Sequence, residues 1–175
     1  MHDEDDQMIK DALILTIFPG AMAVAAINDF FTMMVPNRLA LALVVLFFPL
    51  AYLAGLGLTD IGLHAALAIA MLALALVLFA FDWIGGGDAK LFAATSLWLG
   101  PEAILPYAIY AALIGGALTL LLMSWRRAPL PATLASRDWL ARLHSQKAGV
   151  PYGIALGAAG LLAYLDTPFW AALDG

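Results

Sequence analysis

Two aspartates stand where apolar stretches of the chain end or begin. Asp29 follows the apolar run 12–28, and Asp88 lies directly before the run 89–100. A carboxylate at the edge of hydrocarbon is costly and is therefore a candidate for function. Two carboxylates at one depth can share a proton, so that one acts as a base and the other as an acid. Such a pair activates water for peptide hydrolysis, and we expect Asp29 and Asp88 to be catalytic.

Three consecutive glycines precede the second of these aspartates. Gly85, Gly86 and Gly87 allow backbone geometry that is closed to other residues and let another chain approach, so we expect them to shape the segment beside a scissile bond. A phosphate-binding loop is the other use of clustered glycines, but a Gly-Lys-Ser/Thr ending is missing. Asp82, a little upstream, is better explained as a helix cap at the membrane surface.

Other kinds of site find little support. The 175 residues include no cysteine, which excludes disulfides, thiolate metal sites and a cysteine nucleophile. His64 and His144 have no neighbouring metal ligands, and no Ser/His/Asp set stands out, so both histidines are expected to be structural or solvated. We expect no metal, no cofactor and no nucleic-acid partner.

The composition places these residues in a membrane protein. Hydrophobic residues make up 64% of the chain and charged residues 12%, whereas soluble domains average roughly 45–50% and about 25%. Backbone in hydrocarbon must satisfy its own hydrogen bonds, and a helix that crosses needs about 20 residues. We therefore predict an all-α integral membrane protein with a single domain over residues 1–175, embedded in the lipid bilayer. The six predicted spans are 12–28, 39–58, 61–81, 89–100, 103–123 and 150–165.

The fourth of these spans is short enough to be a re-entrant half-helix, but charge favours a full crossing. With six spans and the N-terminus outside, every basic residue except Lys10 falls on the inner side. Basic residues in short loops mark the cytoplasmic side. We therefore predict both termini, including the acidic tail 1–11, on the periplasmic side, and the loop 124–149 and both catalytic aspartates at the cytoplasmic boundary. The acidic start has the wrong sign for a cleaved signal peptide, so the first run is expected to be retained.

The polar loop before the last span contains a short amphipathic segment. Ser136 is a plausible N-cap for a helix that runs to His144 and lies on the inner leaflet. In the last span, Gly153, Gly157 and Gly160 share one helical face, which predicts close packing against another helix.

Three segments together resemble a known family. The motif G-x-G-D at 85–88 matches the signature of membrane aspartyl proteases, and the longer GGGDAKL at 85–91 resembles the type IV prepilin peptidases. Asp29 followed by Pro-Asn at 36–37 is similar to their first-aspartate segment, and VPYG at 150–153 resembles the start of their last helix. The three segments occur in the right order on a six-span frame, which is far more specific than the four-residue motif alone.

The resemblance implies a bacterial inner-membrane endopeptidase. Such enzymes remove basic leader peptides from prepilins and pseudopilins on the cytoplasmic side, just before the pilin's hydrophobic helix. The family's catalytic aspartates map onto Asp29 and Asp88. Pro36 and Asn37 would fix the turn after the first aspartate. Lys90 would interact electrostatically with the aspartate pair or bind a substrate carbonyl.

The missing cysteines indicate which members of this family the sequence resembles most. Large family members carry a four-cysteine metal site and an N-methyltransferase activity. This sequence lacks the cysteines and is similar to the small CpaA/TadV-like peptidases of tight-adherence (Flp) pili, so methyltransferase activity is not part of the expectation.

Other functions remain open from the residues alone. Buried carboxylates also bind protons and cations, so a small proton- or ion-coupled transporter is one alternative. Transporters more often place their acids near mid-span, between internal repeats. A non-enzymatic assembly subunit of a pilus or secretion machine is the second alternative, and a presenilin-like intramembrane protease is a third.

Overall fold

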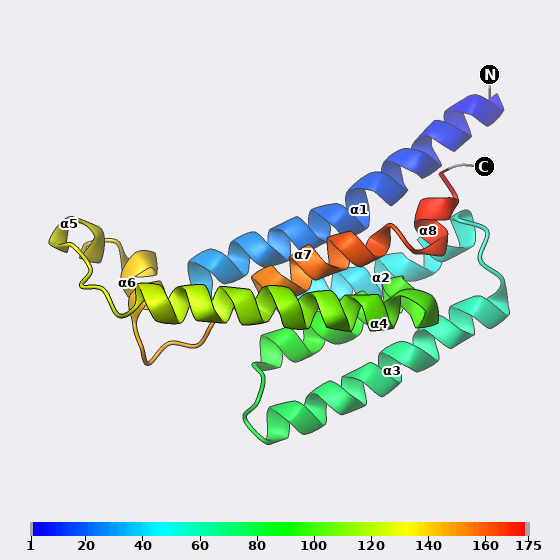
Figure 1. Ribbon diagram of the computed structural model, residues 1–175. Helices are drawn as coiled ribbons and strands as arrows, with labels where there is room; N and C mark the ends of the chain where they lie inside the picture. The colour runs from blue at the N-terminus through cyan, green and yellow to red at the C-terminus, as the bar shows by residue number, and fades with distance from the viewer. Residues whose placement is uncertain (1, 174–175) are drawn as a thin grey trace.

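The computed structural model describes residues 2–173, and every regular element in that part of the chain is a helix. Figure 1 shows that successive long segments run in alternating directions, so that both ends of the chain lie together at one end of the bundle. The α1–α2, α3–α4 and α4–α7 connections lie at the other end. The helices are α1 (His2–Thr32), α2 (Asn37–Leu53), α3 (Leu58–Ala80), α4 (Gly86–Trp125), α5 (Ala132–Ala135), α6 (Asp138–His144), α7 (Tyr152–Tyr164) and α8 (Pro168–Ala171).

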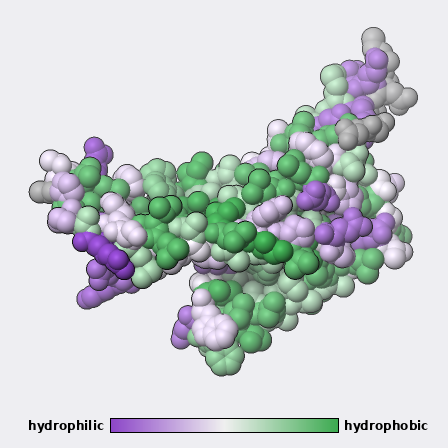
Figure 2. Space-filling view, viewed as in Figure 1, coloured by the Kyte–Doolittle hydropathy of each residue, from purple (hydrophilic) through white to green (hydrophobic). Residues whose placement is uncertain are grey.

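Within the described chain, three helices are long and apolar enough to cross a membrane. They are the segment Gln7–Thr32 of α1, the whole of α3, and α4; the helices α2 and α7 are apolar but shorter. Figure 2 shows hydrophobic residues over the middle of the molecule and hydrophilic residues gathered towards the start of α1 and around α5 and α6. The all-helical prediction is confirmed, with the predicted fourth and fifth spans joined in α4. Residues 2–11, predicted as an acidic tail, form the first turns of α1, and residues 1, 174 and 175 lie outside the described part.

A sharp reversal divides α4 into a first half (86–99) and a second half (101–125). Gly100 has φ 69° and ψ −176°, a backbone conformation that is essentially restricted to glycine. Pro101 has no N–H, so the carbonyl of Leu97 lacks the donor that a continuous helix would supply. The buried ring of His64 on α3 replaces it, with Nδ1 donating to that carbonyl at 2.8 Å. The expectation that His64 is structural is confirmed.

Aromatic side chains join the helices in the half of the bundle that contains this reversal. The ring of Phe18 lies 5.3 Å from Trp98 and 4.6 Å from Tyr164, and Trp98 lies 5.1 Å from Phe169. The indole N–H of Trp98 also donates to the carbonyl of Leu43 at 3.0 Å. Helices in lipid associate through such packing and hydrogen bonds, because lipid tails are as apolar as the side chains. The cluster thus fixes α1, α2, α4, α7 and α8 relative to one another.

Two glycines bring α7 into close contact with α1. A Cβ atom added to Gly157 would lie 2.8 Å from the carbonyl oxygen of Met22, and one added to Gly160 would lie 3.0 Å from the sulfur of Met22. Both approaches are tighter than real Cβ atoms ordinarily show. The predicted close packing of this helix is confirmed.

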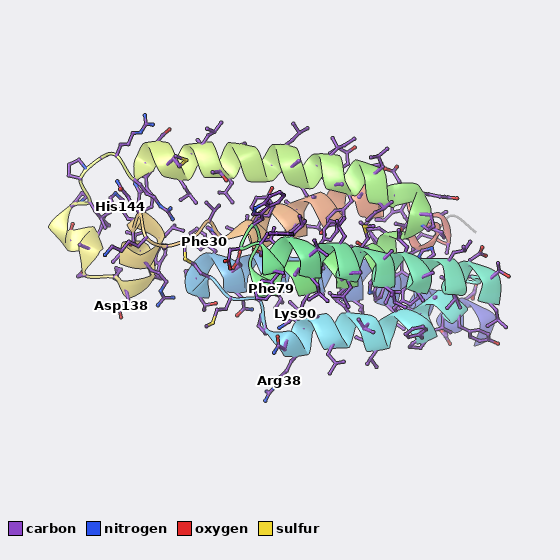
Figure 3. All side chains as sticks on the ribbon, turned by 90° about the horizontal axis from the view of Figure 1, so that it is seen from below. Phe30, Arg38, Phe79, Lys90, Asp138 and His144 are labelled. Carbon is purple, nitrogen blue, oxygen red and sulfur yellow. The ribbon has the colours of Figure 1, made fainter. Side chains whose placement is uncertain are left out.

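The connection from α4 to α7 differs in detail from the prediction. Figure 3 shows α6, with Asp138 and His144, near the end of α1 that carries Phe30. The expected N-cap residue is wrong: α6 begins at Asp138 after Arg137. The hydroxyl of Ser136 instead donates to the carbonyl of Thr133 at 2.9 Å. Ser136 therefore closes the preceding short turn, which competes with its capping role.

Candidate active site

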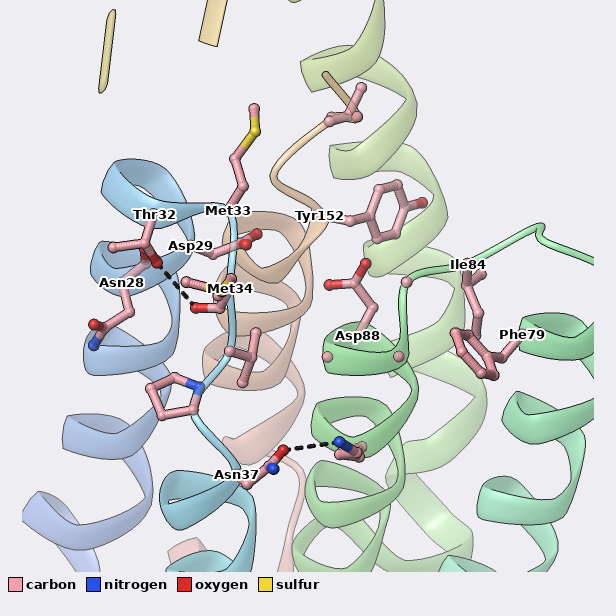
Figure 4. A pocket seen from close by; sticks show the side chains of 18 of the residues that line it. Asn28, Asp29, Thr32, Met33, Met34, Asn37, Phe79, Ile84, Asp88 and Tyr152 are labelled. Atoms are coloured by element: carbon pink, nitrogen blue, oxygen red, sulfur yellow. Dashed lines mark hydrogen bonds between the residues drawn. The ribbon is translucent and has the colours of Figure 1, made fainter. Parts of the chain in front are cut away.

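A cleft of about 1290 Å³ opens at the end of the bundle where the connections meet. Its walls are the last turn of α1, the α1–α2 and α3–α4 connections, the first turn of α4, and the start of α7 (Figure 4). The charged residues that line it are Asp29, Asp82, Asp88 and Lys90. This cleft therefore brings both predicted catalytic aspartates to one site.

The last turn of α1 holds Asp29, whose side chain is 4% exposed. The helix ends at the next turn, where Met33 has φ 55° and its N–H donates to the carbonyl of Asp29 at 2.8 Å. From α7, the backbone N–H of Gly153 donates to Oδ2 of Asp29 at 2.6 Å. A Cβ atom on Gly153 would lie 2.8 Å from the same oxygen, so only glycine fits there without a shift. The carboxylate is thus held in one orientation by a neighbouring helix.

The first turn of α4 holds Asp88. Gly85 is the N-cap residue of this helix, with φ −71° and ψ 147°. Asp88 stands at the third helical position, and its carboxylate interacts with the backbone N–H of Gly85. This is half of a capping box, and an acidic side chain here is also favoured by the positive end of the helix dipole. Local structure therefore positions Asp88 at the mouth of the helix, beside the cleft.

The two aspartates face each other across the cleft. Figure 4 shows the carboxylate of Asp29, from the α1 side, and that of Asp88, from α4, directed into the same space. The two groups are close enough to interact electrostatically. The structure thus brings these residues to one cleft from different helices, whereas their place at the membrane boundary and their catalytic role stay predictions.

The glycines beside Asp88 make room for neighbouring segments of this chain. A Cβ atom on Gly86 would lie 3.3 Å from the ring of Phe79, and one on Gly87 would lie 3.3 Å from the backbone nitrogen of Val35. The close approach at Gly87 joins the α1–α2 connection to the start of α4. All three glycines also line the cleft. Their predicted role beside a substrate backbone is therefore compatible with their position.

One polar contact links α2 to α4 at the edge of the cleft. Pro36 is the N-cap residue of α2, and Asn37 is its first helical residue. The ammonium group of Lys90 donates to Oδ1 of Asn37 at 2.8 Å. Lys90 thus ties the two helix starts together; the structure pairs it with the Pro-Asn segment that follows the first aspartate.

Asp82 ends α3 by its backbone conformation. Its φ is 57°, its N–H donates to the carbonyl of Phe79, and the N–H of Trp83 donates to the carbonyl of Leu78, both at 3.0 Å. This pair of bonds is the Schellman motif, in which the residue after the helix adopts a left-handed conformation. The interpretation of Asp82 as a helix-terminus residue is confirmed, and its side chain is exposed at the cleft.

Tyr152 is a cleft residue that the sequence did not single out for function. Its ring fills the space over Gly115 of α4, where an added Cβ atom would overlap it. Its hydroxyl donates to the carbonyl of Ala111 at 3.1 Å. Tyr152 belongs to the VPYG segment, so a signal was present, but the contact with Gly115 joins residues that are distant in sequence.

The segment before Tyr152 is held by a single arginine. Arg126, at the end of α4, donates to the carbonyls of Leu143, Ala148 and Gly149 at 2.8, 3.1 and 2.8 Å. Gly149 lines the cleft. Arg126 therefore fixes one wall of the cleft. Among the described residues, no group of three or more histidine, aspartate or glutamate side chains could hold a metal ion.

Comparison with known proteins agrees with the geometry of this cleft. The type IV leader peptidase family matches residues 16–120, which include both aspartates and the glycines. A prepilin leader peptidase/N-methyltransferase of Pectobacterium carotovorum subsp. carotovorum is 34% identical over 139 residues, covering 74% of this chain and 47% of the relative. The chain thus spans about half the length of that curated relative. No solved structure matched. With a family match over more than half of its length, this chain belongs to the type IV leader peptidase family.

Proposed function

We propose that this protein is an aspartic endopeptidase that removes leader peptides from type IV (Flp-like) prepilins and pseudopilins. The observation that carries the proposal is the placement of Asp29 and Asp88, from two separate helices, in one cleft of about 1290 Å³. Family membership supports the same reaction. The cleft is larger than the roughly 300–1,000 Å³ typical of small-molecule sites, which suits an extended peptide.

The proposed chemistry uses the two carboxylates as one unit. Oδ2 of Asp29 accepts the N–H of Gly153, which leaves Oδ1 free to take a proton. A water molecule between the carboxylates loses a proton to the ionised member while it attacks the scissile carbonyl carbon. The protonated member donates to the carbonyl oxygen and, as the tetrahedral intermediate collapses, a proton passes to the leaving amine. General acid–base catalysis of this kind contributes about 10²–10⁴-fold.

The charge at the cleft suits a basic leader. Three of the charged residues that line it are aspartates and one is a lysine, and that lysine is already bonded to Asn37. A positively charged peptide is attracted to such a surface, and complementary charge aids both orientation and the rate of encounter.

We further propose six membrane crossings, formed by α1, α2, α3, the two halves of α4, and α7. The cleft then lies at the cytoplasmic boundary of the bacterial inner membrane, and both chain ends lie on the periplasmic side. In support, Lys90 lines the cleft and Arg38 follows the cleft residue Asn37. The basic residues after α4 belong to a connection at the cleft end, whereas Lys10 belongs to the first turns of α1, which lie at the other end. At 1.5 Å per residue the first half of α4 is roughly 20 Å long. This is shorter than the roughly 30 Å thickness of hydrocarbon.

The test is leader removal from a prepilin that is co-expressed with this protein. Unsubstituted protein is expected to shorten the prepilin by its basic leader, as measured by mass spectrometry. Asp29→Asn and Asp88→Asn are each expected to abolish the shortening. Asp82→Asn, in the same cleft, is the matched control and is expected to retain it. Processing that survives either of the first two substitutions would refute the proposal.

A further inference from the structure

A second hollow runs along the side of the bundle and, unlike the cleft, is lined almost entirely by apolar side chains. It is an apolar groove of about 480 Å³ whose walls come from α2 and α3 and whose floor comes from the first half of α4. The groove exists because α2 and α3 hardly touch each other, although both pack against α4. Figure 3 shows Lys90 in the interval between α2 and α3.

Each of the three helices presents one regular stripe of side chains to this groove. The stripes follow spacings of three and four residues, which place side chains on one face of a helix. The stripe on α2 runs from residue 37 to 48, which is roughly 16 Å at 1.5 Å per residue. The stripes on α3 (65–72) and α4 (90–97) are shorter, at roughly 10 Å. The groove therefore has room for about seven to eleven residues of another helix. The lining residues are Asn37, Ala40, Leu41, Val44, Phe48, Ala65, Ala68, Ile69, Leu72, Lys90, Ala93, Ala94 and Leu97.

The groove adjoins the cleft. Asn37 and Lys90 line both hollows, and the hydrogen bond between their side chains lies at the junction. On one side of this pair lie the aspartates, and on the other side the lining is apolar. Large side chains of the groove are exposed, including Leu41 at 63% and Ile69 at 69%.

We propose that this groove binds the apolar transmembrane helix of the substrate, immediately after the scissile bond. The inference rests on the proposed peptidase function and adds the site that holds the membrane part of the substrate. A peptide that passes from the cleft over Lys90 enters a trough lined by apolar side chains, so its continuation must itself be apolar. Because the groove lies at membrane depth, that continuation must satisfy its own backbone hydrogen bonds and is therefore helical.

A substrate helix suits the groove better than a lipid chain does, because the groove adjoins the cleft. A lipid chain would match the apolar lining, but it makes no use of the shared junction at Asn37 and Lys90. The small side chains on the floor and walls, such as Ala68 and Ala94, allow a helix to approach closely, as at other helix contacts in membranes.

A kinetic experiment tests the proposal with two peptides. One carries a basic leader, the cleavage site and an apolar helix, and the other ends a few residues after the cleavage site. Ala68→Trp fills the groove, whereas Ala66→Trp places the same side chain on the exposed face of α3, outside both hollows. We expect Ala68→Trp to raise KM at least about tenfold for the long peptide, equivalent to about 1.4 kcal/mol. Cleavage of the short peptide, and all values for Ala66→Trp, are expected to stay unchanged.

Cross-linking provides a direct second measurement. The chain has no cysteine, so Ile69→Cys in the groove can be paired with a cysteine in the first turns of the substrate helix. With Asp88→Asn present to prevent cleavage, oxidation is expected to link the two, whereas Ala66→Cys is expected to give no link.

The outcomes separate this inference from the function on which it rests. Equal effects of Ala68→Trp on both peptides, no effect on either, or cross-linking at Ala66→Cys as strong as at Ile69→Cys would overturn the groove as the substrate-helix site. Absence of a link at Ile69→Cys would indicate a groove filled by lipid and would also overturn it. Failure of the unsubstituted protein to cleave either peptide would refute the proposed function, and this inference with it.

Discussion

Gly153→Ala is expected to slow peptide cleavage strongly without removing either aspartate. The new Cβ atom would lie 2.8 Å from Oδ2 and 2.9 Å from Cβ of Asp29, whereas ordinary contact begins at 3.4 Å. The carboxylate must therefore move by roughly 0.6 Å, and its 2.6 Å bond to the Gly153 N–H is distorted. A displacement of 1 Å at a reacting group can cost about 10²-fold. We expect kcat/KM to fall about 10- to 100-fold.

The assay for this prediction is cleavage of a leader-containing peptide by purified protein, with thermal unfolding measured in the same detergent. Gly20→Ala is the matched control, because Gly20 is on the same helix as Asp29 and an added Cβ atom there meets nothing within 4 Å. A Gly153→Ala protein that unfolds normally and cleaves at the original rate would refute the reasoning that α7 positions Asp29.

Three further substitutions test other parts of the structure. Gly115→Ala should push the ring of Tyr152 out of its slot and lower the cleavage rate, whereas Gly116→Ala, where an added Cβ atom meets nothing within 4 Å, should not; equal rates would contradict this. Gly100→Ala should destabilise the protein by more than about 1–3 kcal/mol, which is the cost of the strained backbone conformation alone. The added Cβ atom would also overlap the ring of His64. Thermal unfolding in detergent measures the loss of stability. Asp82→Gly should leave kcat unchanged and raise stability by up to about 1 kcal/mol, because Gly populates positive φ without strain; a fall in kcat would show that the Asp82 side chain takes part in the chemistry.

That Asp29 and Asp88 lie at the same end of the bundle could be predicted, because it depends only on the even number of apolar runs between them. Each apolar run reverses the direction of the chain, so the end of the first run and the start of the fourth fall on one side whatever the details of packing. Basic residues predict the orientation in the membrane by the same kind of count, and that orientation stays a prediction. Neither step requires knowledge of how any helix is rotated about its axis.

The contacts that hold the aspartates could not be predicted on that basis. The amide of Gly153 reaches Asp29, and Tyr152 fits over Gly115, only because α7 has one rotation and one height against its neighbours. The sequence pattern predicts only a packing role for Gly153. Such contacts join segments that are distant in sequence, and hydropathy does not record them.

Three further features differ from the prediction or escape it, each for its own physical reason. Ser136 has the right type for an N-cap, but its hydroxyl bonds backwards to Thr133, and the N-cap position is Arg137, one residue later. The reversal at Gly100 needs no loop, because one glycine in an unusual conformation turns the chain by itself. The apolar groove was also invisible, since it exists only because α2 and α3 do not pack together.

The most direct test of the central claim is a double-mutant comparison at the two aspartates. Purified Asp29→Asn, Asp88→Asn and the double variant are compared with the unsubstituted protein for single-turnover cleavage of a leader-containing peptide. If the carboxylates act as one unit, each single substitution lowers the rate by about 10²–10⁴-fold, and the double variant is no slower than the slower single variant. Losses that multiply in the double variant, or a single variant that keeps its rate, would contradict the account.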